Sequence, residues 1–175
     1  MAIFIFFLGT LVFAYFSWRY AIVSPRRQGP YRFVVFEGIL ALVLMNHGAW
    51  FDASGSPVQI VSWVAFALSI YLAIAGFMLL RNRGKPRGHF EYTTVLVTDN
   101  VYRYVRHPMY ASLFLLATGA VLKHPTYWPT LVVYAIVVAA VYGTAKAEEQ
   151  DTLATFGATY AAYMKTSKMF IPFVL

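Results

Sequence analysis

The chain has 175 residues, of which 60% are hydrophobic and only 12% are charged, and its formal net charge is +7. Soluble domains carry about a quarter charged residues, so this composition predicts an integral membrane protein of one domain. The lack of cysteine excludes disulfides and thiolate metal sites. The basic residues lie in short loops between apolar runs, which is typical of the cytoplasmic side of a membrane protein and argues against a nucleic-acid partner.

Five apolar runs are long enough, or nearly long enough, for helices that cross a bilayer, because such a helix needs about 20 apolar residues. In chain order they are Ile3 to about Val23, Phe33 to Trp50, Val58 to Leu80, Pro108 to Leu122 and Trp128 to about Ala147. The fourth run is short, which favours an oblique crossing or a hairpin with the fifth. The sequence therefore predicts an all-α integral membrane protein with about five transmembrane helices.

The loops between these runs differ in their basic residues. The first loop holds Arg26, Arg27 and Arg32, the third holds six Lys or Arg residues between positions 81 and 106, and three lysines follow the last run. The second loop, residues 51–57, has none. Because basic loops stay in the cytoplasm, we expect the N-terminus outside and the C-terminus inside. A plasma membrane is expected rather than an internal membrane.

We expect a single membrane domain, residues 1–175, with four parts. Residues 1–80 carry three transmembrane helices, 81–107 a cytoplasmic loop, 108–147 a transmembrane hairpin, and 148–175 a cytoplasmic amphipathic tail. In the loop, the apolar run of residues 94–98 is too short to cross the membrane, so it is expected to fold over the helix ends as a lid or wall. In the tail, apolar residues recur at helical spacing, which suits an interfacial anchor or a cover for a ligand.

The segment Val101-Tyr-Arg-Tyr-Val-Arg-His-Pro-Met-Tyr110 joins the basic loop to the fourth apolar run. Pro108 suits the first turn of a helix and disfavours a helical conformation at the residue before it. His107 is therefore predicted near the N-cap, with Arg103 and Arg106 just before it. The N–H groups and the partial positive charge of a helix N-terminus would add to these arginines to form a site for a carboxylate or phosphate.

Glu148 and Glu149 follow the fifth apolar run, on the same predicted side of the membrane as this motif. Adjacent helical residues point about 100° apart, so one carboxylate can face a cleft while the other binds backbone or solvent. Arginines beside a membrane helix usually only set its topology, but here an anion site and a cation site occur together. They suit a ligand that carries both charges, such as an amino-acid moiety. No histidine or carboxylate has a suitable spacing from His47, so we expect no metal site.

The order of these residues resembles the signature of the isoprenylcysteine carboxyl methyltransferase and phospholipid methyltransferase superfamily of integral membrane methyltransferases. The matching elements are Arg106-His-Pro-Met-Tyr110, Glu148-Glu149 with Leu153, and Phe156-Gly157 with Tyr160 and Tyr163. The similarity runs from about Leu96 to the C-terminus. It implies that S-adenosylmethionine binds in a cytosol-facing pocket built by the C-terminal half. It also implies a lipophilic or lipidated substrate that enters from the bilayer, among the membrane lipids.

The resemblance also implies roles for individual residues. Arg106, His107 and Pro108, at the helix N-terminus, would bind the polar end of S-adenosylmethionine, and Glu148 or Glu149 would bind its amine or ribose hydroxyls. Leu96, Val97, Tyr104 and Tyr110 would line the adenosine, and Tyr160 would close over it. Arg103 would orient an anionic acceptor, and it completes the predicted catalytic set of Arg103, Arg106, His107 and Glu148.

Two positions depart from the pattern of the superfamily. Asn100 and Ser112 stand where many relatives have glycine. Asparagine can adopt the left-handed turn that glycine provides, so the first change is expected to preserve the loop. The second change is expected to alter helix packing or the lipid entrance.

The predicted reaction is methyl transfer from S-adenosylmethionine to the carboxylate of an isoprenylcysteine-like substrate. A carboxylate nucleophile needs no general base, so alignment and desolvation would supply the acceleration. An amine acceptor would instead need His107 or a glutamate as a base. Three alternatives remain open: N- or O-methylation of a phospholipid or another lipid, a membrane reductase related to sterol reductases, and a non-enzymatic membrane partner protein.

Overall fold

A computed structural model describes residues 2–23, 28–52, 55–87 and 93–172 of the chain. Within these ranges it contains six α-helices, two short 3-10 turns and no strand, so the all-α prediction is confirmed. The helices are α1 (Ala2–Val23), α2 (Gly29–Met45), α3 (Pro57–Arg83), α4 (Pro108–Val121), α5 (Trp128–Phe156) and α6 (Ala158–Thr166). The 3-10 turns are η1 (His47–Ala49) and η2 (Asn100–Arg103).

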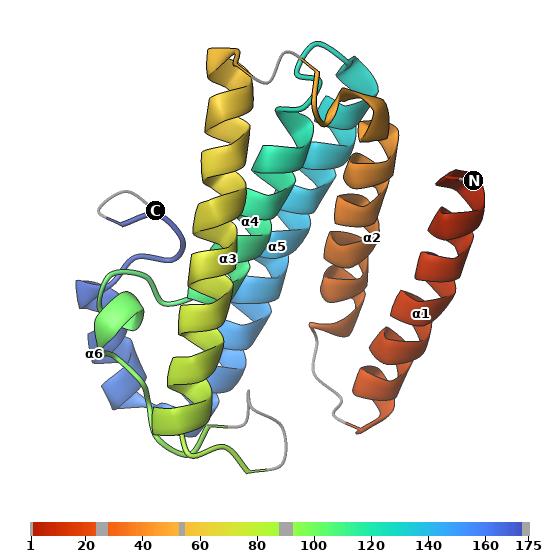
Figure 1. The fold of residues 1–175 in the computed structure, drawn as a ribbon. Helices are drawn as coiled ribbons and strands as arrows, with labels where there is room; N and C mark the ends of the chain where they lie inside the picture. Colours follow the sequence, from red (N-terminus) through yellow and green to blue (C-terminus); the bar gives the residue numbers. More distant parts are fainter. Residues whose placement is uncertain (1, 24–27, 53–54, 88–92, 173–175) are drawn as a thin grey trace.

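Helices α2 to α5 run side by side as a bundle, and α1 lies at its edge along α2 (Figure 1). Within the bundle, α3 packs on α4, and α5 packs on both α2 and α4. The short helix α6 and the segment 93–107 gather beside one end of the bundle, where α3 and α5 end. The segments that carry the predicted site are therefore close together in space.

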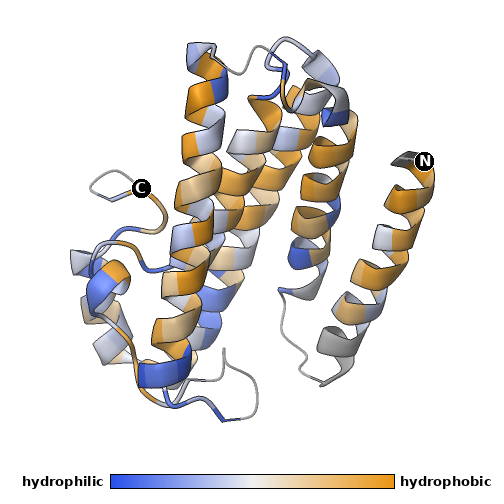
Figure 2. Ribbon diagram, in the orientation of Figure 1, coloured by the Kyte–Doolittle hydropathy of each residue, from blue (hydrophilic) through white to orange (hydrophobic). Residues whose placement is uncertain are grey.

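The distribution of polar residues on α3 is that of a membrane helix. Ile60 and Ile70 are exposed, whereas Ser62 and Ser69 are buried and donate hydrogen bonds of 2.7 and 2.8 Å to carbonyl groups of α4. A soluble amphipathic helix shows the opposite arrangement, while small polar residues between helices are common in membrane bundles. Helices α3 and α5 are each long and apolar enough to cross a membrane, and apolar residues cover most of the bundle (Figure 2).

The second helix begins earlier than the sequence predicts. Because Pro30 suits the first turn of a helix, α2 starts at Gly29, and Arg32, expected in the first loop, lies in its first turn. The helix also ends earlier, at Met45, where the chain turns through η1. Arg26 and Arg27 lie outside the described residues.

The fifth helix continues past its apolar part, residues 128–147, as far as Phe156. The tail predicted from residue 148 therefore begins as the last part of α5, because residues 148–156 contain no glycine or proline that would end the helix. Gly157 ends it with a φ of +53°, a conformation that glycine adopts without strain. After this break the chain forms α6, which packs back against α5.

The segment that leads from α3 towards α4 is irregular but anchored. Val97, Val101 and Tyr102 are buried together against Leu79 and Leu80 of α3. Residues 94–98 therefore lie over the end of this helix.

At the start of η2, Asn100 has a φ of +55°. The prediction that asparagine supplies the left-handed turn is confirmed.

Candidate functional site

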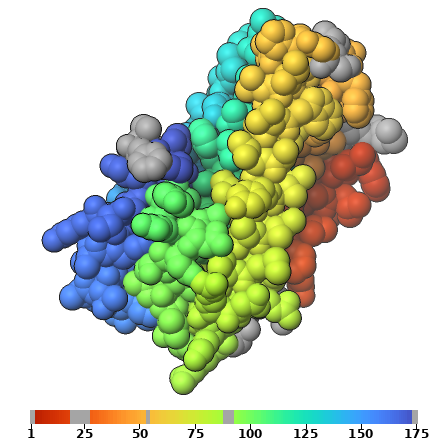
Figure 3. Space-filling view, turned by 60° about the vertical axis from the view of Figure 1, so that its left-hand side comes forward, coloured from red at the N-terminus to blue at the C-terminus, as the bar shows by residue number. Residues whose placement is uncertain are grey.

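A cavity of about 290 Å³, the polar cavity, lies where α3, α5, α6 and the segment 93–107 meet. Figure 3 shows this segment at the surface between α3 and the C-terminal part of the chain. One wall belongs to α5 and carries Glu148, Asp151, Thr152 and Thr155. The other walls combine apolar and aromatic side chains, such as Leu96, Val97 and Tyr160, with the polar side chains of Arg87, Arg106 and His107. Apolar surface with convergent polar groups is typical of a small-molecule site.

Arg106 and Glu149 form a buried ion pair beside this cavity. Nε and Nη2 of Arg106 each lie 2.9 Å from Oε1 of Glu149, whose side chain is only 3% exposed. Nη1 of Arg106 donates hydrogen bonds to the carbonyl groups of Met164 and Ser167. The pair therefore connects the start of α4 to α5 and to the end of α6.

Glu149 is held in its ionised form. Burial by itself raises the pKa of this carboxyl group, but interactions with His107, Arg106 and Lys146 outweigh burial and hold the pKa to about 2. Because this value lies below the ordinary 4.5, the carboxylate adds stability at neutral pH and loses that contribution only as the pH falls from about 4.5 towards 2. Glu149 is not among the described residues that line the polar cavity, and its carboxylate pairs with Arg106 instead.

His107 lies between the two glutamates and is only 5% exposed. Its Nδ1 lies 3.9 Å from Oε1 of Glu148, and its Nε2 lies 3.6 Å from Oε1 of Glu149. Both distances are longer than a hydrogen bond, and Nε2 has no hydrogen-bond partner in the described part of the chain. A buried ring nitrogen in this state is expected to be satisfied by water or by a ligand.

Tyr110 faces away from the polar cavity, although the resemblance implied that it lines the adenosine. Its hydroxyl group donates a hydrogen bond to Glu148 and lies 3.4 Å from Oε1 of the buried Gln28. Gln28 in turn approaches Asp151, with 3.5 Å between Nε2 and Oδ2. Tyr110 therefore contacts Glu148 through its hydroxyl group without lining the polar cavity.

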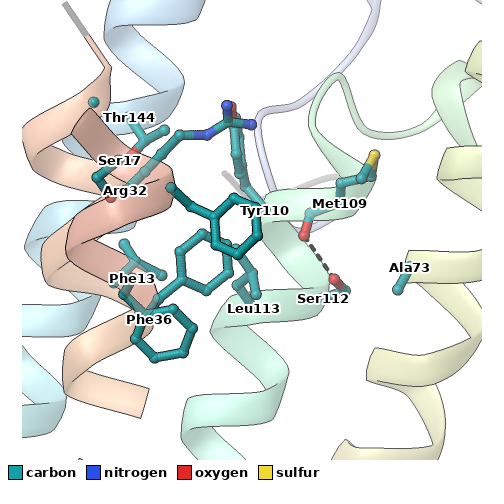
Figure 4. Close-up of a pocket in the computed structure, with 13 residues that line it drawn as sticks. Phe13, Ser17, Arg32, Phe36, Ala73, Met109, Tyr110, Ser112, Leu113 and Thr144 are labelled. Carbon is teal, nitrogen blue, oxygen red and sulfur yellow. Dashed lines mark hydrogen bonds between the residues drawn. The ribbon is translucent and has the colours of Figure 1, made fainter. Parts of the chain in front are cut away.

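The ring of Tyr110 lines a second cavity of about 460 Å³, the apolar cavity, which lies between α1, α2, α3 and α4. Figure 4 shows Phe13, Phe36 and Leu113 grouped in one part of it. Arg32 and Tyr110 lie together at the other end. No described residue lines both cavities, but the hydrogen bond from Tyr110 to Glu148 links a lining residue of one to a lining residue of the other.

Arg103 and Tyr104 are not brought to the polar cavity. The turn η2 directs Val101 and Tyr102 inward against α3, so the next two side chains in the turn are exposed. Pro108 is buried at the start of α4 but does not contribute to the described lining of the cavity. Of the residues predicted to bind the cofactor, the cavity brings together Leu96, Val97, Arg106, His107, Glu148 and Tyr160.

The anion site predicted at the N-terminus of α4 loses two of its donors. The N–H groups of Arg106 and His107 bind the carbonyl groups of Lys168 and Met169 at 2.7 and 3.2 Å. These bonds hold the segment after α6 against the start of α4, where Met169 joins the core. Backbone groups that are already paired in this way are not available to a ligand.

Sequence reasoning missed three polar residues that α5 contributes to the cavity. Asp151, Thr152 and Thr155 follow Glu148 by three, four and seven positions, which places all four on one face of α5. This spacing of polar residues is present in the sequence. The apolar residues of the same stretch also recur at helical spacing, and they indicate an amphipathic tail rather than one wall of a cavity. Arg87 also lines the cavity, and no sequence signal separates it from the neighbouring basic residues.

These features define an all-helical membrane protein with a buried charged site at one end of its bundle. A sequence model of the phospholipid methyltransferase family matches residues 57–159, more than half of the chain. The chain therefore belongs to this family, part of the isoprenylcysteine and phospholipid methyltransferase superfamily, and the family indicates a membrane methyltransferase. A comparison with curated proteins gave no significant match. The matched segment contains the charged site but excludes α1 and α2.

Proposed function

We propose that the protein transfers a methyl group from S-adenosylmethionine to a lipophilic acceptor. The observation that carries this proposal is the contact between the linings of the two cavities: the ring of Tyr110 lines one, and its hydroxyl group binds Glu148, which lines the other. A polar methyl donor and an apolar acceptor need separate sites that meet at one point. Membership of the family favours this function over the reductase and the non-enzymatic partner.

The residues of the polar cavity fit S-adenosylmethionine. Glu148 would bind the amine, and Arg87 offers a positive charge for the carboxylate. Asp151 and Thr152 suit the ribose hydroxyls, while the apolar and aromatic walls suit the adenine. Arg106, which lines the cavity, would contact the cofactor directly, and Glu149 would support Arg106 from behind.

When bound, S-adenosylmethionine supplies an electrophilic methyl group: an acceptor lone pair bonds to its carbon as the carbon–sulfur bond breaks and leaves its electron pair on sulfur. The protein would align the acceptor and exclude water near Tyr110 and Glu148, where the linings of the two cavities are in contact. A carboxylate acceptor becomes a neutral ester and has no proton to lose. With an amine acceptor, His107 or Glu148 would take up the proton.

For the acceptor, we propose the carboxylate of an isoprenylcysteine-like lipid that reaches the apolar cavity from the bilayer. Methylation of a phospholipid at nitrogen or oxygen is the second candidate, and the description of the matched family favours it. Both acceptors combine a hydrocarbon tail with a polar head, as the apolar cavity requires.

We also propose five membrane crossings, with the N-terminus outside and the polar cavity facing the cytosol across the plasma membrane. The chain has no cysteine, so single cysteines can report this topology. A cysteine in place of the exposed Ala154 should react with an impermeant maleimide only after cells are permeabilised. A cysteine in place of the exposed Asp52 should react in intact cells. The reverse pattern would show the opposite orientation.

Calorimetric titration of S-adenosylhomocysteine into the reconstituted protein tests the cofactor. The wild type should bind saturably, and Glu148→Gln should bind about tenfold or more weakly, because a hydrogen bond to a charged group contributes roughly 1.5–3 kcal/mol. Gln150→Ala, on an exposed position of the same helix, is the matched control and should bind like the wild type. No binding to the folded wild type would contradict the proposal.

A further inference from the structure

The apolar cavity has a single charged end. Its described lining is formed mainly by apolar side chains of four helices, and Arg32 carries the one formal charge among the described residues that line it. Its volume of about 460 Å³ lies within the range of small-molecule sites, roughly 300–1,000 Å³. An occupant of this cavity therefore has a hydrocarbon part and a part that matches a guanidinium group.

The position of Arg32 orients such an occupant. Arg32 lies in the first turn of α2, and its Cζ is 5.9 Å from the centre of the Tyr110 ring. Phe36 and Leu113 lie about one helical turn further along α2 and α4, which is about 5 Å deeper into the bundle. In Figure 4, Phe36 stands beside Phe13, and their rings stack with centroids 5.6 Å apart. A head group at Arg32 thus places the tail among these rings.

The same position brings the head group close to the hydrogen-bonded pair of Tyr110 and Glu148, which lies between the two cavities. Tyr110 contacts Arg32 through its ring and Glu148 through its hydroxyl group. The titratable groups that line the polar cavity lie on the other side: Arg87, Tyr102, Arg106, His107, Glu148, Asp151, Tyr160 and Tyr163. A head group held at Arg32 is therefore separated from the polar cavity by one side chain.

A guanidinium group recognises oxygen anions best. Its planar set of donors matches a carboxylate or phosphate with two parallel hydrogen bonds, whereas it binds an uncharged head more weakly and repels an ammonium head. The family match begins at residue 57, so Arg32 belongs to the part of the chain that the family does not define. Arg32 is thus a feature of this chain that can set its choice of acceptor.

We propose, on the basis of the methyl transfer proposed above, that Arg32 selects an amphiphile with an anionic oxygen head and one hydrocarbon tail in the apolar cavity. Arg32 is a specificity residue that positions the head beside Tyr110. Lipids with an uncharged or cationic head lack the matching charge. A carboxylate head that has become a methyl ester loses its charge as well, so the product binds more weakly than the substrate.

Competition binding in nanodiscs of zwitterionic lipid tests the head group. A fluorescent hexadecanoate would be displaced by hexadecanoate, hexadecyl phosphate, hexadecanol, methyl hexadecanoate or hexadecyltrimethylammonium at matched mole fraction. The wild type should prefer the anionic heads over the other three by roughly tenfold to a hundredfold, the range expected for hydrogen bonds to a charged group. The better competitor of the two anions identifies the head as a carboxylate or a phosphate.

Variants test the contact with the head group and the contact with the hydrocarbon tail independently. Arg32→Gln should remove the preference for anions, Arg32→Lys should keep part of it, and the exposed control Arg81→Gln should keep all of it. Ala73→Phe should weaken every amphiphile alike because Ala73 lines the cavity, while Ile74→Phe, on the exposed side of α3, should not. An equal affinity of the wild type for hexadecanol, or a preference that survives in Arg32→Gln, would overturn the proposal.

The same samples distinguish this proposal from the methyltransferase activity. Arg32→Gln should bind S-adenosylhomocysteine like the wild type, because Arg32 does not line the polar cavity. If the wild type binds no S-adenosylhomocysteine but still prefers anionic heads through Arg32, the acceptor site is supported and the proposed methyl transfer is contradicted. If it binds S-adenosylhomocysteine without any preference among the heads, the cofactor site is supported and the proposed role of Arg32 is contradicted.

Discussion

Arg106→Gln should lower the free energy of unfolding by about 3–5 kcal/mol, the cost of removing one partner from a buried ion pair. The variant leaves the carboxylate of Glu149 buried beside a neutral side chain, and it removes the donors to the carbonyl groups of Met164 and Ser167. Thermal unfolding in detergent, followed by circular dichroism, would measure the loss. Arg81→Gln, at an exposed position, is the charge-matched control and should stay within about 0.5 kcal/mol of the wild type.

The double variant Arg106→Met with Glu149→Leu identifies the cause of this loss. If an uncompensated charge is what destabilises the single variants, removing both charges should recover much of the stability. The two effects should then be far from additive, as expected for residues in contact. A single Arg106→Gln variant as stable as the wild type would show that the pair does not hold α4, α5 and α6 together.

Thr152→Trp should abolish binding of S-adenosylhomocysteine and reduce methyl transfer by about a hundredfold or more, a loss of at least about 2.7 kcal/mol. Thr152 lines the polar cavity on the face of α5 that also carries Glu148, and an indole ring would fill much of its 290 Å³. Calorimetric titration and transfer of a labelled methyl group to lipid extracts would measure the two effects.

Ala154→Trp is the matched control for this change. Ala154 lies two residues further along α5 and is exposed, so the same indole ring there should leave binding and activity unchanged. The melting temperature of both variants would show that the bundle remains folded. Wild-type affinity in Thr152→Trp would mean that the cofactor binds elsewhere.

The sequence predicts much of the site because its motif residues lie on well-defined helices. Pro108 marks the start of α4, and the apolar run after it fixes the length of the helix. Glu148 falls on the same end of the bundle because α5 runs antiparallel to α4. Leu96, Val97 and Tyr160 reach the cavity from segments that the resemblance already assigns to the cofactor.

The differences between the predicted residues and the lining of the polar cavity share a physical origin. Tyr110 is three positions from His107, yet the rotation of α4 against α2 places its ring in the other cavity. Arg103 and Tyr104 lie in the motif, but burial of the two residues before them in η2 leaves their side chains exposed. The sequence places Arg32 in the first loop, but α2 starts before it, at Gly29, because Pro30 suits the first turn of a helix. The spacing of residues along the chain does not determine how each helix or turn is oriented, and that orientation decides which side chains face a cavity.

Composition, helical spacing and the ordered motif by themselves determined the all-α membrane class and the methyltransferase family, because both depend on residue types and on distances along the chain. The tertiary structure alone assigned Glu149 to a buried pair with Arg106 and Glu148 to the cavity. Two adjacent residues on a helix differ only by a rotation of about 100° about its axis. Which of them faces the cavity depends on how α5 packs against α4 and α6, and that packing exists only in the folded chain.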